Sequence, residues 1–345
     1  MTHYRLVFIG FGNVGQALAR LLERKRDMLE QDYGATFSVT GIYTQRHGGA
    51  IDPQGIDLDR ALENVARGGS LDVLSKQAAP KEGVEFIHAC PGEVLFENSP
   101  VNHHTGQPAI DHLRAALNQG MHAITANKGP VAHGYHELRD LAAERGRQFR
   151  FESSVMDGAP IFSLFREALP AIELRGFHGI LNSCTNLLLE LQELGQSFDE
   201  ALAYALSIGI PETDPSADVD GWDAAIKVSA ISTVLMGVAL TPQEVEREGI
   251  RGIDAARRAE AQAQGKRWKL VCSAWREDGG VRGRVRPEMV GPDSPLYSIN
   301  GTSSYCQFET DVLPGLGIVE SNPGPETTAY GLLADFISVL DRSIH

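Results

Sequence analysis

The sequence predicts an α/β fold in which a doubly wound parallel sheet is followed by a second, α+β domain. Strand-like and helix-like segments alternate up to about residue 150, and the pattern then changes to longer strands. A chain of 345 residues is long enough for about two domains. We therefore expect a first domain over residues 1–149, a second domain over 150–319, and a C-terminal helix within 320–345 that returns to the first domain.

The first domain begins with a short apolar strand at residues 6–9, followed by glycines and by apolar residues at helical spacing over 14–28. Strands are then predicted at 37–43, 84–89 and 122–125, with a helix at 110–119. Strands that alternate with helices are joined by right-handed crossovers, so we expect a parallel sheet covered on both faces.

The second domain is predicted from longer strands and two helices. In chain order, its segments are strands at 148–152 and 173–181, helices at 198–207 and 223–240, and strands at 268–275 and 281–286. The last two strands flank Asp278, Gly279 and Gly280, a sequence typical of a hairpin turn. A final helical pattern covers 326–340.

The composition argues against several classes of protein. Lys+Arg 31 against Asp+Glu 45 gives a net charge of −14, which is unfavourable for binding nucleic acid. The basic cluster of Lys266, Arg267 and Lys269 is typical of a solvated strand edge. Four distant cysteines without a CxxC pair indicate neither a disulfide framework nor a zinc site. No apolar run is long enough for a signal peptide or a membrane span, so we expect a cytoplasmic protein.

A GxGxxG motif follows the first predicted strand. Gly10 permits the turn, Gly12 lets a diphosphate approach the backbone, and Gly15 allows the helix to pack closely on the strand. Asn13 and Val14 complete the turn, and backbone amides at the start of the helix face the phosphates. We expect these five residues to bind a dinucleotide in a Rossmann-type domain. A glycine turn without a ligand is the alternative.

The end of the second predicted strand indicates which dinucleotide binds. NAD-binding domains place an Asp or Glu there to accept hydrogen bonds from a ribose 2′-hydroxyl. This stretch reads Thr44, Gln45, Arg46, His47 and contains no acid. Arg46 can bind a 2′-phosphate through two hydrogen bonds, which favours NADP over NAD. A solvated surface arginine is the alternative.

Five acids within twelve residues precede a lysine. Glu212 is the first of them, Asp218 is the third, and Asp223 lies four residues before Lys227 on one helix face. The helix continues as an apolar segment, which favours a buried cleft over an exposed ion pair. Lys128 follows the strand at 122–125, at the sheet edge where ligands bind. Two lysines and several acids near a nicotinamide suit hydride transfer, because the oxygen must gain or lose a proton.

The chain resembles homoserine dehydrogenases over nearly its whole length. The resemblance rests on the glycine turn and on the segments TANKGP around Lys128, FESSVMDGAP from Phe151, GILNSCTN from Gly179 and ETDPSADVDGWDAAIK from Glu212. It implies a homodimer whose second domain is catalytic, and the interconversion of L-aspartate 4-semialdehyde and L-homoserine in threonine and methionine biosynthesis. Because the chain stops at His345, we expect a short form without a regulatory domain.

The resemblance also implies roles for the charged residues. Lys227 would donate a proton to the aldehyde oxygen, and Lys128 would assist at the carbonyl and contact the nicotinamide. The acids Glu212, Asp218 and Asp223 would bind the substrate, with Glu212 and Asp223 at its amino and hydroxyl ends.

Further positions are implied for the cofactor and for a cation. Gly209 and Gly324 would contact the dinucleotide. A monovalent cation such as sodium would be held largely by backbone carbonyls of four residues: Glu152, Val155, Asp157 and Ala159.

Two turns differ from the pattern of the family, and they leave other functions open. The segments NSCTN at 182–186 and NPGP at 322–325 would fit a relative that reduces another amino-acid semialdehyde. A nucleotide-sensing protein without turnover is a further alternative. The combination of Lys128, Asp223 and Lys227 argues against a sensor, which needs no proton donor beside the nicotinamide.

Overall fold

The computed structural model describes residues 1–210 and 214–340, which divide into two compact units. Unit 1 comprises Met1–Pro160 together with Gly324–His345, and unit 2 comprises Ile161–Pro323. Both boundaries lie slightly further along the chain than those expected from the sequence. The reason at the first boundary is that the loop after residue 150 packs on the last helix of the chain and therefore stays with unit 1.

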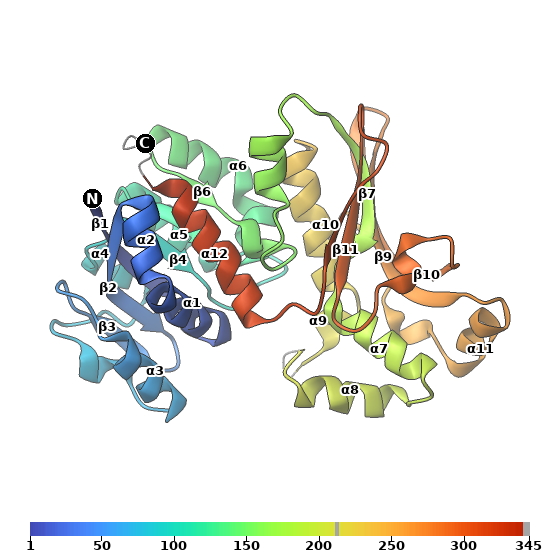
Figure 1. Cartoon of the computed structure of the whole chain (residues 1–345), viewed down its shortest axis with the longest axis horizontal. Helices are drawn as coiled ribbons and strands as arrows, with labels where there is room; N and C mark the ends of the chain where they lie inside the picture. The colour runs from blue at the N-terminus through green and yellow to red at the C-terminus, as the bar shows by residue number, and fades with distance from the viewer. Residues whose placement is uncertain (211–213, 341–345) are drawn as a thin grey trace. The chain divides into compact units, whose positions relative to one another are not determined.

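Unit 1 is built on a six-stranded sheet with the order β3-β2-β1-β4-β5-β6 (Figure 1). All neighbouring pairs are parallel except β2 and β3, which form an antiparallel hairpin. The strand order reverses between β1 and β4, and ligands bind at the carboxyl ends of strands at such a switch point. The strands are β1 (Thr2–Ile9), β2 (Ala35–Thr44), β3 (Gly48–Ile51), β4 (Val94–Glu97), β5 (His122–Thr125) and β6 (Phe149–Arg150).

The helices of unit 1 connect these strands. They are α1 (Asn13–Arg24), α2 (Arg26–Tyr33), α3 (Leu58–Ala66), α4 (Gly83–Ala89), α5 (Ala109–Asn118), α6 (Lys128–Glu144) and α12 (Pro325–Val339). The single helix predicted over 14–28 is interrupted at Lys25, where α1 ends and α2 begins.

The strand predicted at residues 84–89 is wrong, because this segment is helix α4 and the strand is β4. In α4, Gly83, Phe86 and Ile87 are buried, a spacing that lines one face of a helix. A short apolar run does not distinguish a buried helix from a strand. The four residues of β4 are all buried, as expected for the centre of a parallel sheet.

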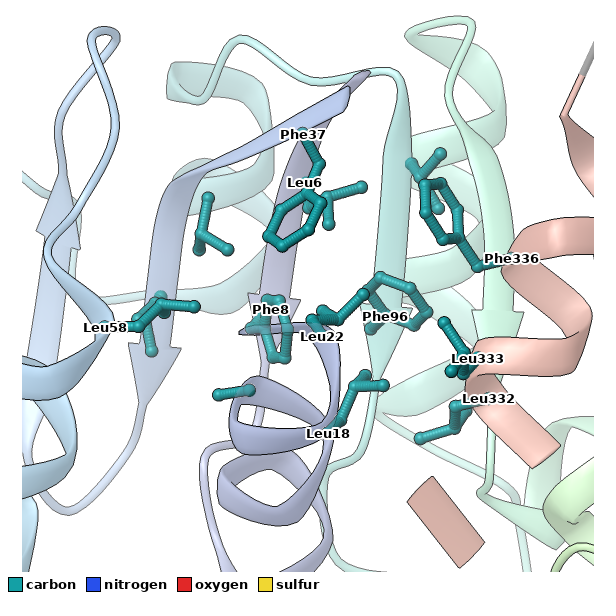
Figure 2. Packing of buried hydrophobic residues seen from close by; sticks show 14 of the residues in the cluster. Leu6, Phe8, Leu18, Leu22, Phe37, Leu58, Phe96, Leu332, Leu333 and Phe336 are labelled. Carbon is teal, nitrogen blue, oxygen red and sulfur yellow. The ribbon is translucent and has the colours of Figure 1, made fainter. Parts of the chain in front are cut away.

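The core of unit 1 lies between the sheet and the helices α1 and α12. Leu18 and Leu22 of α1 pack on the same cluster as Phe8 and Phe96 from the two central strands (Figure 2). The ring centroids of Phe96 and Phe336 lie 6.1 Å apart, so α12 contributes to this cluster as well. The last helix of the chain therefore completes the core around the first strand.

Unit 2, whose strands β7, β9, β10 and β11 are labelled in Figure 1, contains a second six-stranded sheet. Its order is β12-β11-β7-β9-β10-β8, and among its pairs only the short pair of β8 and β10 is parallel. The predicted hairpin is confirmed as β9 and β10, with Asp278 and Gly279 at positive φ in the turn. The strands are β7 (Leu174–Ile180), β8 (Glu246–Arg247), β9 (Arg267–Glu277), β10 (Gly280–Val290), β11 (Ser304–Thr310) and β12 (Leu316–Glu320).

The helices of unit 2 are α7 (Ser183–Glu193), α8 (Phe198–Ser207), α9 (Ser216–Val219), α10 (Trp222–Leu235) and α11 (Ala255–Ala263). The bounds of α8 match the prediction. The helix α10 ends earlier than predicted because Met236 caps it and Gly237 adopts φ +70°. Among the described residues, none of the helices is long and apolar enough to cross a membrane.

Candidate active site

The glycine turn of unit 1 follows β1, and its three glycines play different roles. Gly10 has φ +91°, and a Cβ there would lie 2.3 Å from the carbonyl oxygen of Asn98. A Cβ on Gly15 would lie 2.6 Å from the carbonyl oxygen of Gly10. By contrast, a Cβ on Gly12 would meet nothing within 4 Å. The fold therefore requires the first and third glycines, whereas the second leaves open space that a diphosphate can approach.

The residues after this turn begin helix α1. Asn13 and Val14 are its first two residues. Amides in the first turn of a helix have no acceptor within the helix, and the helix dipole adds positive potential there. This arrangement and the open space at Gly12 fit the diphosphate of a dinucleotide.

A Gly12→Ala substitution distinguishes an effect on dinucleotide binding from an effect on protein stability. Because the backbone of Gly12 is extended (φ −78°, ψ −157°) and a Cβ has room, we expect the free energy of unfolding to change by less than about 1 kcal/mol. The methyl group occupies the approach of the diphosphate, so we expect the Kd of NADP⁺ to rise at least about tenfold. Thermal unfolding and calorimetric titration measure the two effects.

The matched control is Gly15→Ala, whose methyl group meets backbone in the folded protein. This variant should lose stability before any ligand is added. A Gly12→Ala protein that binds NADP⁺ as tightly as the wild type would contradict the role assigned to the second glycine.

Arg46 lies in the exposed turn between β2 and β3. The turn is fixed by the backbone N–H of His47, which donates to Thr44 Oγ1 at 2.7 Å, and by His47 Nδ1, which lies 2.9 Å from the carbonyl oxygen of Gly69. Among the described residues, no carboxylate pairs with the Arg46 guanidinium. A cationic group is thus presented at the carboxyl end of β2, the position from which a ribose is recognised in such sheets.

Lys128 is the first residue of α6 and follows β5 closely. The side chain of Asn127 caps this helix by accepting from the Gly129 backbone N–H at 2.9 Å. The Nδ2 atom of Asn127 donates to the carbonyl oxygen of Ser99 at 3.1 Å, which ties the start of α6 to the end of β4. The backbone of Lys128 is therefore held at the carboxyl edge of the sheet.

In unit 2, Asp223 and Lys227 form the predicted contact on α10. Lys227 Nζ lies 3.3 Å from Asp223 Oδ2 and donates to the carbonyl oxygen of Leu181 at 2.6 Å. The two side chains are only 13% and 11% exposed, so this pair is not the solvated surface pair of the alternative interpretation. An ammonium held between a carbonyl and a carboxylate has a defined direction, as a proton donor requires.

Asn182 also belongs to this cluster, although no role was predicted for it from its place in the sequence. Its Nδ2 donates to Asp218 Oδ1 at 2.6 Å and to Asp223 Oδ2 at 2.9 Å, while its Oδ1 accepts from the Thr185 backbone N–H at 2.8 Å and caps α7. The sequence feature that could have identified Asn182 is its place directly before a helix, in the turn after a strand, where an Asn typically caps the helix. Two carboxylates against the single ammonium of Lys227 leave a net charge of −1, which favours a cationic substrate group.

Cysteine chemistry does not contribute to this cluster. All four cysteines are buried and free. Burial raises the pKa of Cys184, and the charges of Asp218 and Asp223 raise it further. Burial also raises the pKa of Cys272 to about 12. Both side chains are therefore thiols at neutral pH and not nucleophiles.

The interpretation of Lys266, Arg267 and Lys269 as a solvated strand edge is wrong for Lys269, which is 1% exposed. Its Nζ donates to Asn186 Oδ1 at 2.9 Å and to the carbonyl oxygen of Ile299 at 2.5 Å. Burial and the charge of Arg267 lower the pKa of Lys269 to about 8. Residues 268–272 of β9 are all buried, so Lys269 is buried with them, and its ammonium is stabilised by the hydrogen bonds that it donates to α7 and to a loop.

Other predicted positions lie along loops. Gly209 follows α8 with φ +74°, and Gly324 is the residue before α12. Glu212 lies outside the described residues.

The loop predicted to hold a cation contains its four residues in one stretch after β6. Glu152 is buried, and its backbone N–H donates to Asp335 Oδ2 at 2.7 Å. Asp157 has φ +42° and accepts from Thr328 Oγ1 at 2.5 Å, and the Ala159 backbone N–H donates to the Met156 carbonyl. Val155 lies between them and is buried. Residues 1–210 and 214–340 contain no cluster of three or more His, Cys, Asp or Glu side chains suited to a metal ion.

The two groups of candidate residues belong to different units. Gly10 to Gly15, Arg46, Lys128 and Gly324 lie in unit 1, and Gly209, Asp218, Asp223 and Lys227 lie in unit 2. Within each unit, the contacts given above hold the candidate residues in place. Apart from Gly209, the positions predicted to bind the dinucleotide thus lie in unit 1, and the acid–lysine cluster lies in unit 2.

Comparison with known proteins gives matches over both units. The model of the homoserine dehydrogenase NAD-binding domain matches residues 10–152, and the homoserine dehydrogenase model matches residues 160–337. An NAD(+)-dependent homoserine dehydrogenase from Pseudomonas canavaninivorans is 32% identical, with 98% of this chain and 97% of the relative covered. A homoserine dehydrogenase from Methanocaldococcus jannaschii is 34% identical, with 98% and 99% covered.

Solved structures give similar matches. A hyperthermophilic archaeal homoserine dehydrogenase in complex with NADPH has a TM-score of 0.83 at 28% identity, with 98% of each chain covered. A homoserine dehydrogenase from Thiobacillus denitrificans has a TM-score of 0.82 at 26% identity, with 99% of this chain and 74% of that chain covered.

Proposed function

The chain belongs to the homoserine dehydrogenase family, and we propose that it interconverts L-aspartate 4-semialdehyde and L-homoserine with NADP in preference to NAD. The observation that carries this proposal is the largely buried Asp223–Lys227 pair, joined by Asn182 to Asp218. Assays of the purified protein with homoserine and each oxidised cofactor test it directly. Absence of turnover with both cofactors would refute it.

Lys227 acts as the proton donor during reduction of the aldehyde. When bound, the reduced nicotinamide supplies the hydride. As the carbonyl oxygen gains negative charge, the Lys227 ammonium donates a proton to it, and in the reverse direction the amine accepts this proton. Asp223 favours the charged form of Lys227 and, with the Leu181 carbonyl, sets the direction of its N–H bonds.

The carboxylates bind the amino-acid part of the substrate. Asp218 and Asp223 are held in place by one amide, that of Asn182, and present negative charge to the substrate, with Asp223 at its hydroxyl end. Glu212 completes this acidic site in the proposal. The other substrate class considered, a different amino-acid semialdehyde, carries the same α-ammonium and would differ in chain length.

Most of the residues proposed to bind the dinucleotide belong to unit 1, and Gly209 belongs to unit 2. Gly12, Asn13 and Val14 receive the diphosphate, and Lys128 contacts the nicotinamide and assists at the carbonyl. Gly209 and Gly324 complete the dinucleotide contacts. The support for Lys128 is its fixed place at the carboxyl edge of the sheet.

Arg46 determines the preference between cofactors, because relatives named above include both an NAD(+)-dependent enzyme and a complex with NADPH. We expect Arg46→Ala to lower kcat/KM for NADPH by about 10–100-fold, since a bidentate guanidinium–phosphate pair is lost. The value for NADH should change less than about twofold, because NADH has no 2′-phosphate. Steady-state kinetics with both cofactors measure the ratio, and an unchanged ratio would remove this role.

A monovalent cation such as sodium orders the loop at Glu152, Val155, Asp157 and Ala159. Two hydrogen bonds already fix this loop against α12, through Asp335 and Thr328, and backbone carbonyls are suitable ligands for such a cation. The rate measured against sodium concentration at constant ionic strength tests this site.

The protein is proposed to be a cytoplasmic homodimer associated through unit 2. In the described structure, β12 is an edge strand, and Val312, Leu313 and Val319 on and beside it are exposed apolar side chains. Exposed edges and apolar side chains favour association. Sedimentation equilibrium measures the state, and a monomer at micromolar concentration would refute it.

The family matches favour homoserine dehydrogenase over the two alternatives considered from the sequence, a reductase of another amino-acid semialdehyde and a nucleotide sensor. Turnover of another amino-acid semialdehyde, with none of aspartate semialdehyde, would favour the first. Dinucleotide binding without any turnover would favour the second.

A further inference from the structure

Asn98 carries a side-chain amide for which the chain itself provides no partner. It directly follows β4, the strand next to β1 across the switch point of the sheet. In the part of the chain that the structure describes, its Oδ1 and Nδ2 are both buried and neither forms a hydrogen bond. Buried polar groups are normally hydrogen-bonded, so an amide retained here indicates a partner from outside the chain.

The backbone around Asn98 is held by contacts with β1 and with the glycine turn. The Asn98 backbone N–H donates to the Ile9 carbonyl oxygen at 2.7 Å. Its own carbonyl oxygen lies so close to Gly10 that a Cβ there would be 2.3 Å away. The preceding residue, Glu97, is fully buried and accepts from the Ser99 backbone N–H at 3.2 Å. The amide is therefore held next to the glycine turn.

The position of Asn98 indicates which half of the dinucleotide this residue contacts. A dinucleotide in such a sheet lies across the switch point, with the adenosine half on the side of β2 and its turn. The nicotinamide half then lies on the side of β4, where Asn98 is the first residue after the strand. Phe96 packs with the core under α1 and α12, and the alternation of a strand directs Asn98 to the same face, where α1 begins.

We propose that the Asn98 amide binds the hydroxyls of the nicotinamide-side ribose. An amide offers one acceptor oxygen and two donor hydrogens, and each ribose hydroxyl both donates and accepts, so the two groups are complementary. The residue as a whole is only partly buried, so a ligand beside the glycine turn can come close to this side chain. The inference rests on the proposed function, because it requires that unit 1 binds NADP or NAD.

Binding of three probes to Asn98→Leu tests this inference. Leucine has the same number of side-chain heavy atoms as asparagine, with bulkier methyl groups in place of the amide, and its side chain forms no hydrogen bond. We expect the Kd of NADP⁺, and of 2′-phospho-ADP-ribose, which retains the second ribose, to rise about tenfold. The Kd of 2′,5′-ADP, which lacks that ribose, should change less than twofold. Calorimetric titration measures all three, without turnover.

Thermal unfolding of the unliganded variant is the second measurement. Because the amide has no partner in the chain, Asn98→Leu should unfold at the wild-type temperature or higher. A clearly lower temperature would overturn the inference by showing a structural role. The control Asn118→Leu replaces an exposed amide at the end of α5 and should leave all three Kd values unchanged.

The remaining outcomes are also decisive. Unchanged binding of NADP⁺ to Asn98→Leu would overturn the inference and leave a bound water as the partner of the amide. Equal weakening of all three probes would overturn it as well, because it would show damage to the glycine turn. If the wild type binds none of the probes, the proposed function fails, which is a distinct result.

Discussion

Lys227→Met is expected to lower kcat for homoserine oxidation by about 10²–10⁴-fold while leaving the Kd of NADP⁺ within twofold. Methionine keeps the apolar length of the lysine stem but cannot donate or accept the proton. The Asp223 carboxylate keeps the hydrogen bond from Asn182 Nδ2 at 2.9 Å, so the cluster retains one of its connections. The expected loss is therefore catalytic, with a smaller effect on folding.

Stopped-flow and steady-state measurements of NADPH formation test this expectation, with circular dichroism as a check of the fold. Lys266→Met is the matched control, because Lys266 is a partly exposed lysine of unit 2 just before β9. It should retain wild-type kcat. A Lys227→Met enzyme with an unaffected rate would exclude Lys227 as the proton donor.

Asp223→Asn is expected to lower kcat/KM for homoserine by about 10²–10³-fold, with a marked increase in KM. The change removes the negative charge beside Lys227 Nζ, 3.3 Å away, and halves the charge offered to the substrate by the two carboxylates that Asn182 holds. It also places one amide against another, so the donor of Asn182 loses its charged acceptor. The increase in KM distinguishes this variant from Lys227→Met.

The control for Asp223→Asn comes from the same acidic segment. Asp220 pairs with Arg251 at 2.5 Å on a more exposed part of unit 2, so Asp220→Asn should leave kcat/KM within about twofold. Initial rates over a range of homoserine concentrations at fixed NADP⁺ give both constants. If the two substitutions lowered kcat/KM equally, the activity would depend on the total negative charge of the segment and not on the position of the Asp223 carboxylate.

Features that depend on neighbouring residues were predictable from the sequence. The glycine turn, the bounds of α8, the β9–β10 hairpin and the contact of Asp223 with Lys227 all depend on spacings of one to five residues or on turn chemistry. Helical and strand periods express such local preferences directly. The strand predicted at 84–89 failed because a short segment with apolar residues at 84, 86, 87 and 89 is compatible with both periods.

Features that depend on distant contacts were decided by the tertiary structure. Asn182 meets Asp223 41 residues away, and Lys227 meets Leu181 46 residues away, so no local pattern marks either partner. The burial of Lys269 and the unpaired amide of Asn98 likewise depend on what other segments place around them. The sequence by itself determined the local elements and the residue types of the chemistry. Packing of the sheets and helices decided which of those residues meet, because hydrogen bonds and ion pairs act only between atoms that folding brings within a few ångströms.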